Sequence, residues 1–267
     1  MDAVSRCRSS AVGTIVVTAT LLLMPLAALA QLKVIISGGF SGPYEKLLPE
    51  FERTTGIKVA TGSGASQGTG PQTIAAQLAR GEPADVVILS REGLEELMAA
   101  KRIAAGTDVD LARTPLGVAV RAGAAKPDVS TVEAFKQLML KARMVAVPGS
   151  TSGIFIMKDV LPRLGIAGQV NVKPTSRGTG ATAMVASGEA DVAVLPVSEI
   201  VHAAGIDFAG VLAEEIQLNQ IFCAAIVAGS KQTEAANKLI GFLASERAAG
   251  TIKAGGMEPL GKRRADR

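Results

Sequence analysis

The sequence predicts an α/β protein of two lobes, each an open and mainly parallel sheet flanked by helices, with a ligand cleft between the lobes. Short apolar runs alternate with segments of helical period, which is typical of βαβ units. This alternation occurs twice along the chain, so we expect two sheets. Glycine- and serine-rich loops follow several of the expected strands, and open α/β sheets bind ligands at such loops.

The first lobe begins with a strand and an amphipathic helix. Apolar side chains at positions 44, 47, 48 and 51 fall on one helix face, and Gly56 ends the helix. The elements expected in order are a strand at 32–36, a helix over 44–55, a strand at 57–61, a helix from Pro71 to Leu78, a strand at 84–89 and a helix around 94–98.

The second lobe repeats this pattern. Its expected elements are a crossing strand at 116–120, a helix over 132–142, a strand at 144–147, helices over 154–161 and 180–187, a strand at 190–195 and a short helix at 198–203. An apolar strand at 220–227 crosses back, and a helix over 234–244 packs on the first lobe. We therefore predict one lobe from residues 31–116 with 221–267, a second from residues 117–220, and a hinge at the two crossings.

The first thirty residues predict a signal peptide, 1–30. Arg6 and Arg8 precede an apolar stretch, and Ala28-Leu29-Ala30 matches a small-x-small cleavage site. A transmembrane anchor is the alternative, but two threonines and a proline interrupt the stretch, which is close to the minimum spanning length. We expect cleavage near Ala30 and a mature protein in the periplasm.

The composition limits the possible functions. Hydrophobic residues make up 48% of the 267 residues, enough for a large core, and the formal net charge is only +4. Nucleic-acid binding is disfavoured because the chain has no Trp, one Tyr and no basic stripe lined by aromatic residues. With one His and one cysteine in the mature chain, Cys223, we expect no metal and no cofactor. Cys223 lies in an apolar run, which predicts a buried thiol.

Three loops each follow an expected strand and lead into a helix. At that position, free backbone N–H groups and the helix dipole favour an anion. Serine and glycine are also common cap and turn residues, so each loop alone is weak support, but their occurrence in both lobes favours a binding site. The candidate ligand-binding residues are Ser37, Gly38, Gly39, Ser41, Ser63, Ser66, Ser150, Thr151 and Ser152.

Two arginines are candidates for binding a carboxylate. Arg91 and Arg177 lie at strand-to-helix turns, and a guanidinium group matches two carboxylate oxygens, although a solvated loop arginine is the simpler interpretation of each. The sequence contains none of the motifs of hydrolase elbows, P-loops or zinc proteases. A helix end best explains the single histidine, His202, so the residues alone identify no catalytic group.

The order of these motifs resembles the periplasmic solute-binding proteins similar to the molybdate-binding protein of bacterial ABC importers. The resemblance covers nearly all of the mature chain, and its landmarks are the segments at 50–59, at 74–89 with Gly81-Glu82-Pro83-Ala84-Asp85, and at 188–193. These are scaffold motifs, so they imply the type II binding-protein fold more strongly than they imply a ligand.

Three departures from the molybdate binders concern the ligand loops. Gly38-Gly39-Phe40 replaces the serine expected after the first strand, with Ser41 slightly beyond. The loop around Ser63 and Ser66 is longer, and residues 194–197 lack the usual tyrosine. These replacements favour an organic carboxylate over a tetrahedral oxyanion.

Other segments resemble a divergent branch that includes the periplasmic aconitate isomerases, enzymes that move a double bond in a tricarboxylate. The segments are 37–39, 79–87, 126–130 and 150–153. Such an activity requires a base within reach of the carbon acid, and cationic or amide donors for the carboxylates. The residues alone do not identify this base.

Three functions follow from the resemblance. The leading expectation is a monomeric receptor that captures a small anion, a di- or tricarboxylate, for an inner-membrane ABC permease. The alternative is a cofactor-free isomerase of an unsaturated polycarboxylate, with Arg91 or Arg177 holding the substrate. The second alternative is a molybdate- or tungstate-binding protein, whereas a structural role is disfavoured because polar loops converge at the strand ends of both lobes.

Overall fold

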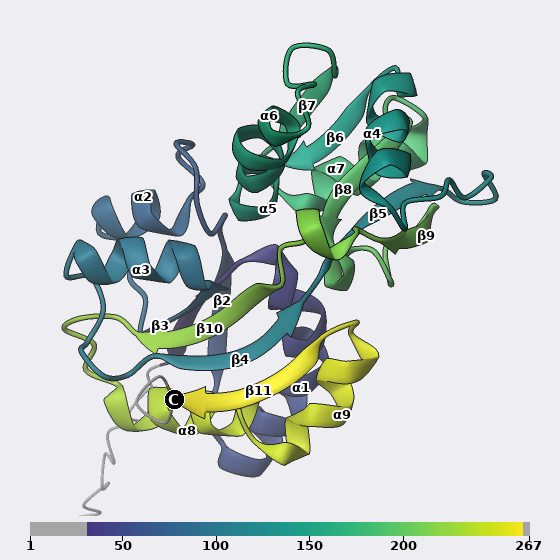
Figure 1. Ribbon diagram of the computed structural model, residues 1–267. Coiled ribbons are helices and arrows are strands. Elements are labelled where there is room, and N and C mark those ends of the chain that lie inside the picture. Colours follow the sequence, from purple (N-terminus) through teal and green to yellow (C-terminus); the bar gives the residue numbers. More distant parts are fainter. Residues whose placement is uncertain (1–30, 264–267) are drawn as a thin grey trace, which may run out of the picture. The chain divides into compact units, whose positions relative to one another are not determined.

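The computed structural model describes residues 31–263, which belong to one compact unit (Figure 1). The expected signal peptide at 1–30 lies outside the described residues. Within the described part, none of the helices has the length and apolar character needed to cross a membrane.

The elements form two groups, each built around one sheet. The first group consists of β1 (Leu32–Ile36), α1 (Gly38–Thr55), β2 (Val59–Ser63), α2 (Ile74–Ala79), β3 (Val86–Ser90), α3 (Arg91–Ala99), β4 (Val109–Thr114), β10 (Gln220–Ile226), α8 (Thr233–Leu243), α9 (Glu246–Ala254) and β11 (Glu258–Arg263). The second group consists of β5 (Leu116–Arg121), α4 (Val132–Lys141), β6 (Val145–Pro148), α5 (Thr151–Phe155), the π-helix η1 (Ile156–Val160), α6 (Leu161–Arg163), β7 (Val172–Thr175), α7 (Gly178–Ser187), β8 (Val192–Pro196), the 3₁₀ turn η2 (Val197–Glu199), β9 (Ile206–Val211) and the 3₁₀ turn η3 (Glu214–Ile216).

The first sheet has six strands in the order β11-β4-β10-β3-β1-β2. β1 pairs in parallel with β2 and β3, whereas β10 is antiparallel to β3 and β4. In this register Phe222 of β10 lies opposite Ser90 of β3. The start of β10 therefore lies beside the end of β3, and both contribute side chains to the same edge of the sheet.

The second sheet has five strands in the order β7-β6-β8-β5-β9. β6 pairs in parallel with β7 and β8, and β5 is antiparallel to β8 and β9. Leu116 of β5 lies opposite Pro196 of β8, so the start of β5 lies beside the end of β8.

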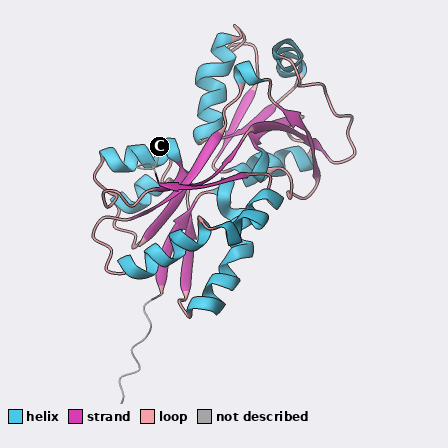
Figure 2. Cartoon of the chain, turned by 60° about the horizontal axis from the view of Figure 1, so that its bottom comes forward, coloured by secondary structure: helices cyan, strands magenta, loops and turns pink. Residues whose placement is uncertain are grey.

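The chain passes between the two sheets twice. Pro115 alone separates β4 of the first sheet from β5 of the second, and the chain returns between β9 and β10. Helices cover both faces of each sheet (Figure 2). The predicted two-lobed α/β fold is therefore confirmed.

Apolar clusters on both faces hold each sheet to its helices. In the first sheet, one cluster includes residues of α1, α8 and α9, and the other includes residues of α2 and α3. In the second sheet, α4 and the continuous helical segment 151–163 cover one face and α7 covers the other. Helix α1 buries Tyr44, Leu47 and Phe51 and ends at Gly56, whose positive φ of 72° is favourable for glycine.

Both sheets contain antiparallel pairs, but most of their strands share one direction, as predicted: β10 and β11 run against the other four strands of the first sheet, and β5 runs against the other four of the second. Other features of the fold differ from the sequence-based prediction. Residues 198–203 contribute one 3₁₀ turn, Val197–Glu199, instead of a short helix. Strand β4 was not predicted, because it contains a charged residue. This residue, Asp110, is 1% exposed and forms an ion pair with Arg91.

Candidate functional site

A small pocket lies where the loops after β1, β2, β6, β7 and β8 meet the start of β10. The space of about 330 Å³ at this pocket includes open solvent at its mouth. The residues that line it are Ser37, Gly38, Gly39, Gly64, Ala65, Ser66, Pro148, Ser150, Ser152, Arg177, Gly178, Glu199, Gln220 and Phe222.

Three helices begin at this pocket. The N-cap residues of α1, α5 and α7 are Ser37, Ser150 and Arg177; all three line the pocket, and none makes a side-chain capping hydrogen bond. In contrast, Thr73 and Ser90, the N-caps of α2 and α3, accept hydrogen bonds from their own helices. The first N–H groups of α1, α5 and α7 therefore remain available to a ligand, and the positive ends of these helices favour an anion.

Three buried polar atoms on the pocket wall have no hydrogen-bond partner among the described residues. They are Ser37 Oγ, Arg177 Nε and Gln220 Oε1. The Ser37 and Gln220 residues are only 3% and 4% exposed. Leaving a buried polar group unpaired costs about 1–3 kcal/mol, so a ligand that bonds to these groups gains that contribution.

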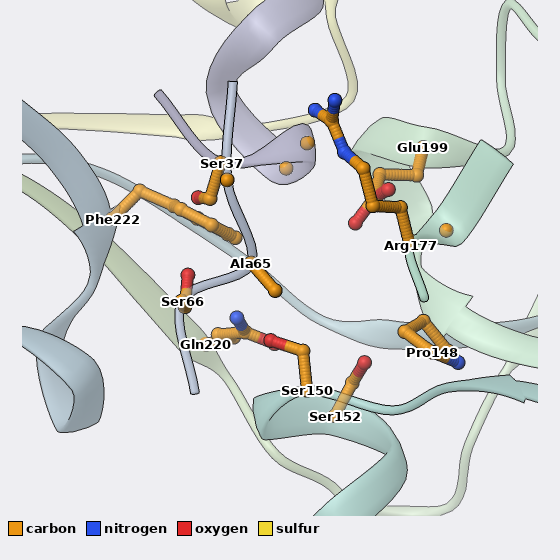
Figure 3. Close-up of a pocket in the computed structure, with 14 residues that line it drawn as sticks. Ser37, Ala65, Ser66, Pro148, Ser150, Ser152, Arg177, Glu199, Gln220 and Phe222 are labelled. Carbon is orange, nitrogen blue, oxygen red and sulfur yellow. The ribbon is translucent and has the colours of Figure 1, made fainter. Parts of the chain in front are cut away.

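The side chains form two facing groups (Figure 3). Arg177 and Glu199 lie next to each other on one side, and Ser37, Ser66 and Phe222 lie on the other. The pocket thus has a charged side and a side that combines hydroxyl groups with an aromatic ring. A small molecule with several carboxylate groups and a short apolar segment would match both sides.

The backbone at Arg177 is fixed by the end of β7. Thr175 Oγ1 donates a hydrogen bond of 2.7 Å to the Arg177 carbonyl oxygen, and the Gly149 N–H donates one of 2.6 Å to the Thr175 carbonyl oxygen. The Gly180 N–H of α7 donates a further bond of 3.0 Å to the Arg177 carbonyl. These bonds tie together the β6 and β7 loops, so the arginine side chain starts from a defined position.

Glu199 is the acidic group of the pocket. It ends the 3₁₀ turn η2 directly after β8. The residue keeps some exposed surface because it faces the pocket, but protein atoms surround its carboxyl group. This desolvation raises the pKa of Glu199 to about 7, although the nearby Arg177 guanidinium lowers it. The carboxyl group therefore titrates near neutral pH.

Seven of the predicted ligand-binding residues line the pocket: Ser37, Gly38, Gly39, Ser66, Ser150, Ser152 and Arg177. They come from both lobes. Ser66 Oγ accepts a hydrogen bond of 2.9 Å from the Ser90 N–H, which leaves its own proton free to donate.

The other four predicted residues do not line the pocket. Ser41 donates to the Gly38 carbonyl oxygen at 2.7 Å, and Ser63 is exposed at the end of the edge strand β2. Thr151 Oγ1 lies 2.7 Å from Ser90 Oγ, so its hydroxyl joins the two lobes.

Arg91 is the clearest correction. Its guanidinium forms ion pairs with Asp108, at 2.7 Å, and with Asp110, and its side chain is 13% exposed. These two carboxylates occupy the fork that we expected to hold a ligand carboxylate. Arg91 thus links α3 to the β4 region and leaves Arg177 as the arginine of the pocket.

Glu199, Gln220 and Phe222 line the pocket but were missed by the sequence analysis. Glu199 follows a strand end, so the rule that identified the serine loops would have found it after β8. Gln220 and Phe222 lie at the start of an antiparallel strand, which that rule does not cover.

His202 and Cys223 lie outside the pocket. His202 is exposed, and its Nε2 lies 2.9 Å from the Ala254 carbonyl oxygen. Cys223 is a buried free thiol, as predicted. Among the described residues, no group of three or more His, Cys, Asp or Glu side chains is arranged to hold a metal ion.

The two-lobed fold with a small pocket at the strand ends defines a solute-binding protein. The family described as bacterial extracellular solute-binding protein matches residues 32–258, and the chain belongs to this family. An aconitate isomerase from Pseudomonas sp. is 34% identical over 262 residues, which cover 96% of this chain and 97% of the relative.

Solved structures share the fold at lower identity. The periplasmic molybdate-binding protein of Azotobacter vinelandii has a TM-score of 0.66 at 23% identity, over 85% of this chain and 98% of the other. The sulfate-binding protein SubI from Mycobacterium tuberculosis has a TM-score of 0.68 at 19% identity, over 86% and 87% of the two chains. The sequence-based resemblance to this family is therefore confirmed.

Proposed function

We propose that the chain binds an unsaturated polycarboxylate of the aconitate class in this pocket and isomerises it without a cofactor. The observation that carries the proposal is the convergence of three uncapped helix N-termini with the Arg177 side chain on one small pocket. Helix N-termini and a guanidinium group each bind carboxylates, and several such groups in one pocket match a ligand with several carboxylates. The aconitate isomerase from Pseudomonas sp., similar over nearly its whole length, supports the same substrate class.

A receptor that captures such a carboxylate without converting it is the second candidate. Membership in the solute-binding family favours it, and it would act as a monomer with an inner-membrane ABC permease as its partner. Molybdate or tungstate is a weaker choice, because Gly38-Gly39-Phe40 replaces the serine expected after β1 and residues 194–197 lack the usual tyrosine.

Family membership among extracellular proteins implies export. We propose that the segment 1–30 is a signal peptide cleaved near Ala30, so that the protein acts in the periplasm. Mass spectrometry of the protein secreted into the periplasm would test this by giving the first residue of the mature chain.

The proposed function is tested by binding and conversion with the purified exported protein. Thermal shift and calorimetry would compare trans-aconitate, cis-aconitate, saturated tricarballylate, citrate, molybdate and sulfate, and ¹H NMR would follow each aconitate isomer. A ligand at 100 times its Kd stabilises the protein by about 2.7 kcal/mol. We expect the tricarboxylates to stabilise it and each aconitate isomer to convert to the other.

Each other outcome has a distinct meaning. Binding of tricarboxylates without conversion supports the receptor, and stabilisation by molybdate alone contradicts the carboxylate proposal.

Arg177→Lys is the matched variant, because it keeps the charge and removes the planar fork. We expect it to weaken tricarboxylate binding by about tenfold or more, since hydrogen bonds to charged groups contribute about 1.5–3 kcal/mol.

A further inference from the structure

We propose that Glu199 is the catalytic residue that moves the proton during this isomerisation. Its carboxylate removes a proton from the methylene carbon of the bound tricarboxylate and returns it to the former vinylic carbon. The inference rests on the proposed function and assigns a role to a group that the pocket otherwise leaves unexplained.

The first argument is the composition of the pocket wall. Of the fourteen residues that line it, Glu199 and Arg177 are the charged ones, and Glu199 is the one acid. The remaining polar groups are serine hydroxyls, the Gln220 amide and backbone groups, which are poor proton acceptors from carbon at neutral pH. Glu199 is therefore the lining residue that can accept a proton from the substrate carbon.

The second argument is the position of the carboxyl group. The Val197 N–H donates a hydrogen bond of 3.0 Å to the Pro115 carbonyl oxygen, and the Ser198 N–H donates one of 3.4 Å to Thr114 Oγ1. The turn η2 is thus anchored to the segment where the chain crosses between the sheets. This anchoring positions Glu199 at the pocket wall, next to the start of α1.

The third argument is that two glycines make room for this carboxyl group. An added Cβ at Gly38 would lie 2.6 Å from Glu199 Oε2, and one at Gly178 would collide with the same oxygen. The starts of α1 and α7 therefore approach Glu199 from two sides. Desolvation raises the pKa of Glu199 to about 7 and the nearby Arg177 guanidinium lowers it, so the base form is populated at neutral pH.

The carboxyl oxygens are also free to act. None of the hydrogen bonds found between described residues uses the side-chain oxygens of Glu199. A carboxylate that is desolvated and unbonded is a stronger base than one in water. Its lone pairs can therefore approach a substrate C–H bond without first breaking a bond to the protein.

The proton transfer balances without another reactant. The methylene C–H bond breaks, and its electron pair spreads over the allylic unit and the adjoining carboxylate. A C–H bond then forms at the other end of the allylic unit, and the double bond has moved by one position. The helix N-termini at the pocket would stabilise the charge that develops on the carboxylate.

The proposal gives binding and turnover opposite dependences on pH. A polycarboxylate beside Glu199 favours its protonated form, so affinity should fall as pH rises through about 7, the pKa of this group. Turnover needs the deprotonated form in the complex, where the bound polycarboxylate holds the Glu199 pKa above its ligand-free value of about 7, so kcat should rise with pH above about 7. The charged group that faces Glu199 from the elements packed against it is Arg177 of the α7 N-cap.

The test compares wild type with Glu199→Gln, an isosteric change that removes the base. We expect trans-aconitate affinity at pH 8 to be kept or increased, and conversion to fall by about 10²- to 10⁴-fold. Affinity of Glu199→Gln should no longer depend on pH between pH 6 and pH 8. Glu214→Gln is the matched control, because Glu214 also lies in a single 3₁₀ turn but faces solvent.

The outcomes separate the inference from the proposed function. If wild type neither binds nor converts an aconitate isomer, the proposed function itself fails. If wild type converts it and folded Glu199→Gln does so within roughly tenfold, Glu199 is not the proton-transfer group. Glu199→Asp provides a second variant should the amide not fold: a wild-type rate would overturn the inference, and a rate lower by about tenfold or more with affinity kept would support it.

Discussion

At the scale of single residues, the pocket depends on the absence of side chains as much as on their presence. Gly38 and Gly178 stand at the starts of α1 and α7, and a Cβ atom at either position would meet the Glu199 carboxyl group. Any side chain at Gly178 would take the space of that carboxylate. The position of Glu199 is therefore set by two glycines that carry no chemistry of their own.

Gly178→Ala should displace the Glu199 carboxyl group and reduce turnover. A misplacement of about 1 Å can cost about 10²-fold in rate, so we expect kcat for aconitate conversion to fall by about that factor. The measurement is the NMR conversion rate together with the calorimetric Kd. Gly42→Ala is the control, because a methyl group there would meet no atom within 4 Å. Equal rates for Gly178→Ala and wild type would mean that the carboxyl position is unimportant.

At the scale of elements, one buried hydrogen bond connects the two lobes beside the pocket. Ser90 Oγ at the end of β3 lies 2.7 Å from Thr151 Oγ1 at the start of α5. A weaker bond of 3.4 Å runs nearby from the Gln67 N–H to Ser150 Oγ. We propose that residues 31–116 with 221–267 and residues 117–220 close over a ligand as two lobes, and that these contacts form on closure.

Thr151→Val should weaken ligand binding by removing the bond between the lobes. A net contribution of about 0.5–1.5 kcal/mol corresponds to a Kd for trans-aconitate about two- to tenfold higher. Calorimetry would measure this change. Thr182→Val is the matched control, because the Thr182 hydroxyl donates to Thr179 of its own helix at 3.1 Å. An unchanged Kd for Thr151→Val would mean that closure does not depend on this contact.

The sequence was informative where a residue's role depends on its place along a strand or helix. Ser37, Ser66, Ser150 and Arg177 were identified because each follows a strand, and strand ends meet at one edge of a sheet. Arg91 follows a strand in the same way. It was assigned wrongly because its partners belong to a part of the first sheet that the sequence did not predict.

The partners of Arg91 explain why that part was missed. Asp108 precedes β4 and Asp110 lies within it, and charged residues are unusual in a buried strand. Burial of the two carboxylates is favourable only because Arg91 of α3 forms ion pairs with them. This contact joins segments that are distant in the sequence, so a local sequence pattern does not predict it. Gln220 was missed for a related reason, since its place at the pocket depends on the antiparallel pairing of β10 with β4, where it lies opposite Thr114.

At the scale of the whole molecule, the pocket makes stability depend on pH. A buried carboxyl group with a raised pKa holds its proton in the folded state at pH values where the unfolded chain has lost it. Stability then falls as pH rises, because unfolding releases that proton. A ligand that binds in the pocket must also overcome this cost of keeping water away from the ionised carboxyl group.

Glu199→Gln should therefore stabilise the ligand-free protein more at high pH than at low pH. The ordinary pKa of this carboxyl is 4.5 and burial raises it to about 7, so its favourable contribution is complete below pH 4.5 and is lost by about pH 7. At 1.36 kcal/mol per pKa unit, the loss is about 3 kcal/mol.

Urea unfolding of wild type and Glu199→Gln at pH 5 and pH 8 would measure the difference between their free energies of unfolding. We expect that difference to shift in favour of the variant by as much as this amount between the two pH values. A difference that stays constant with pH would mean that the Glu199 carboxyl is solvated in the free protein, and that the lobes are open before a ligand binds.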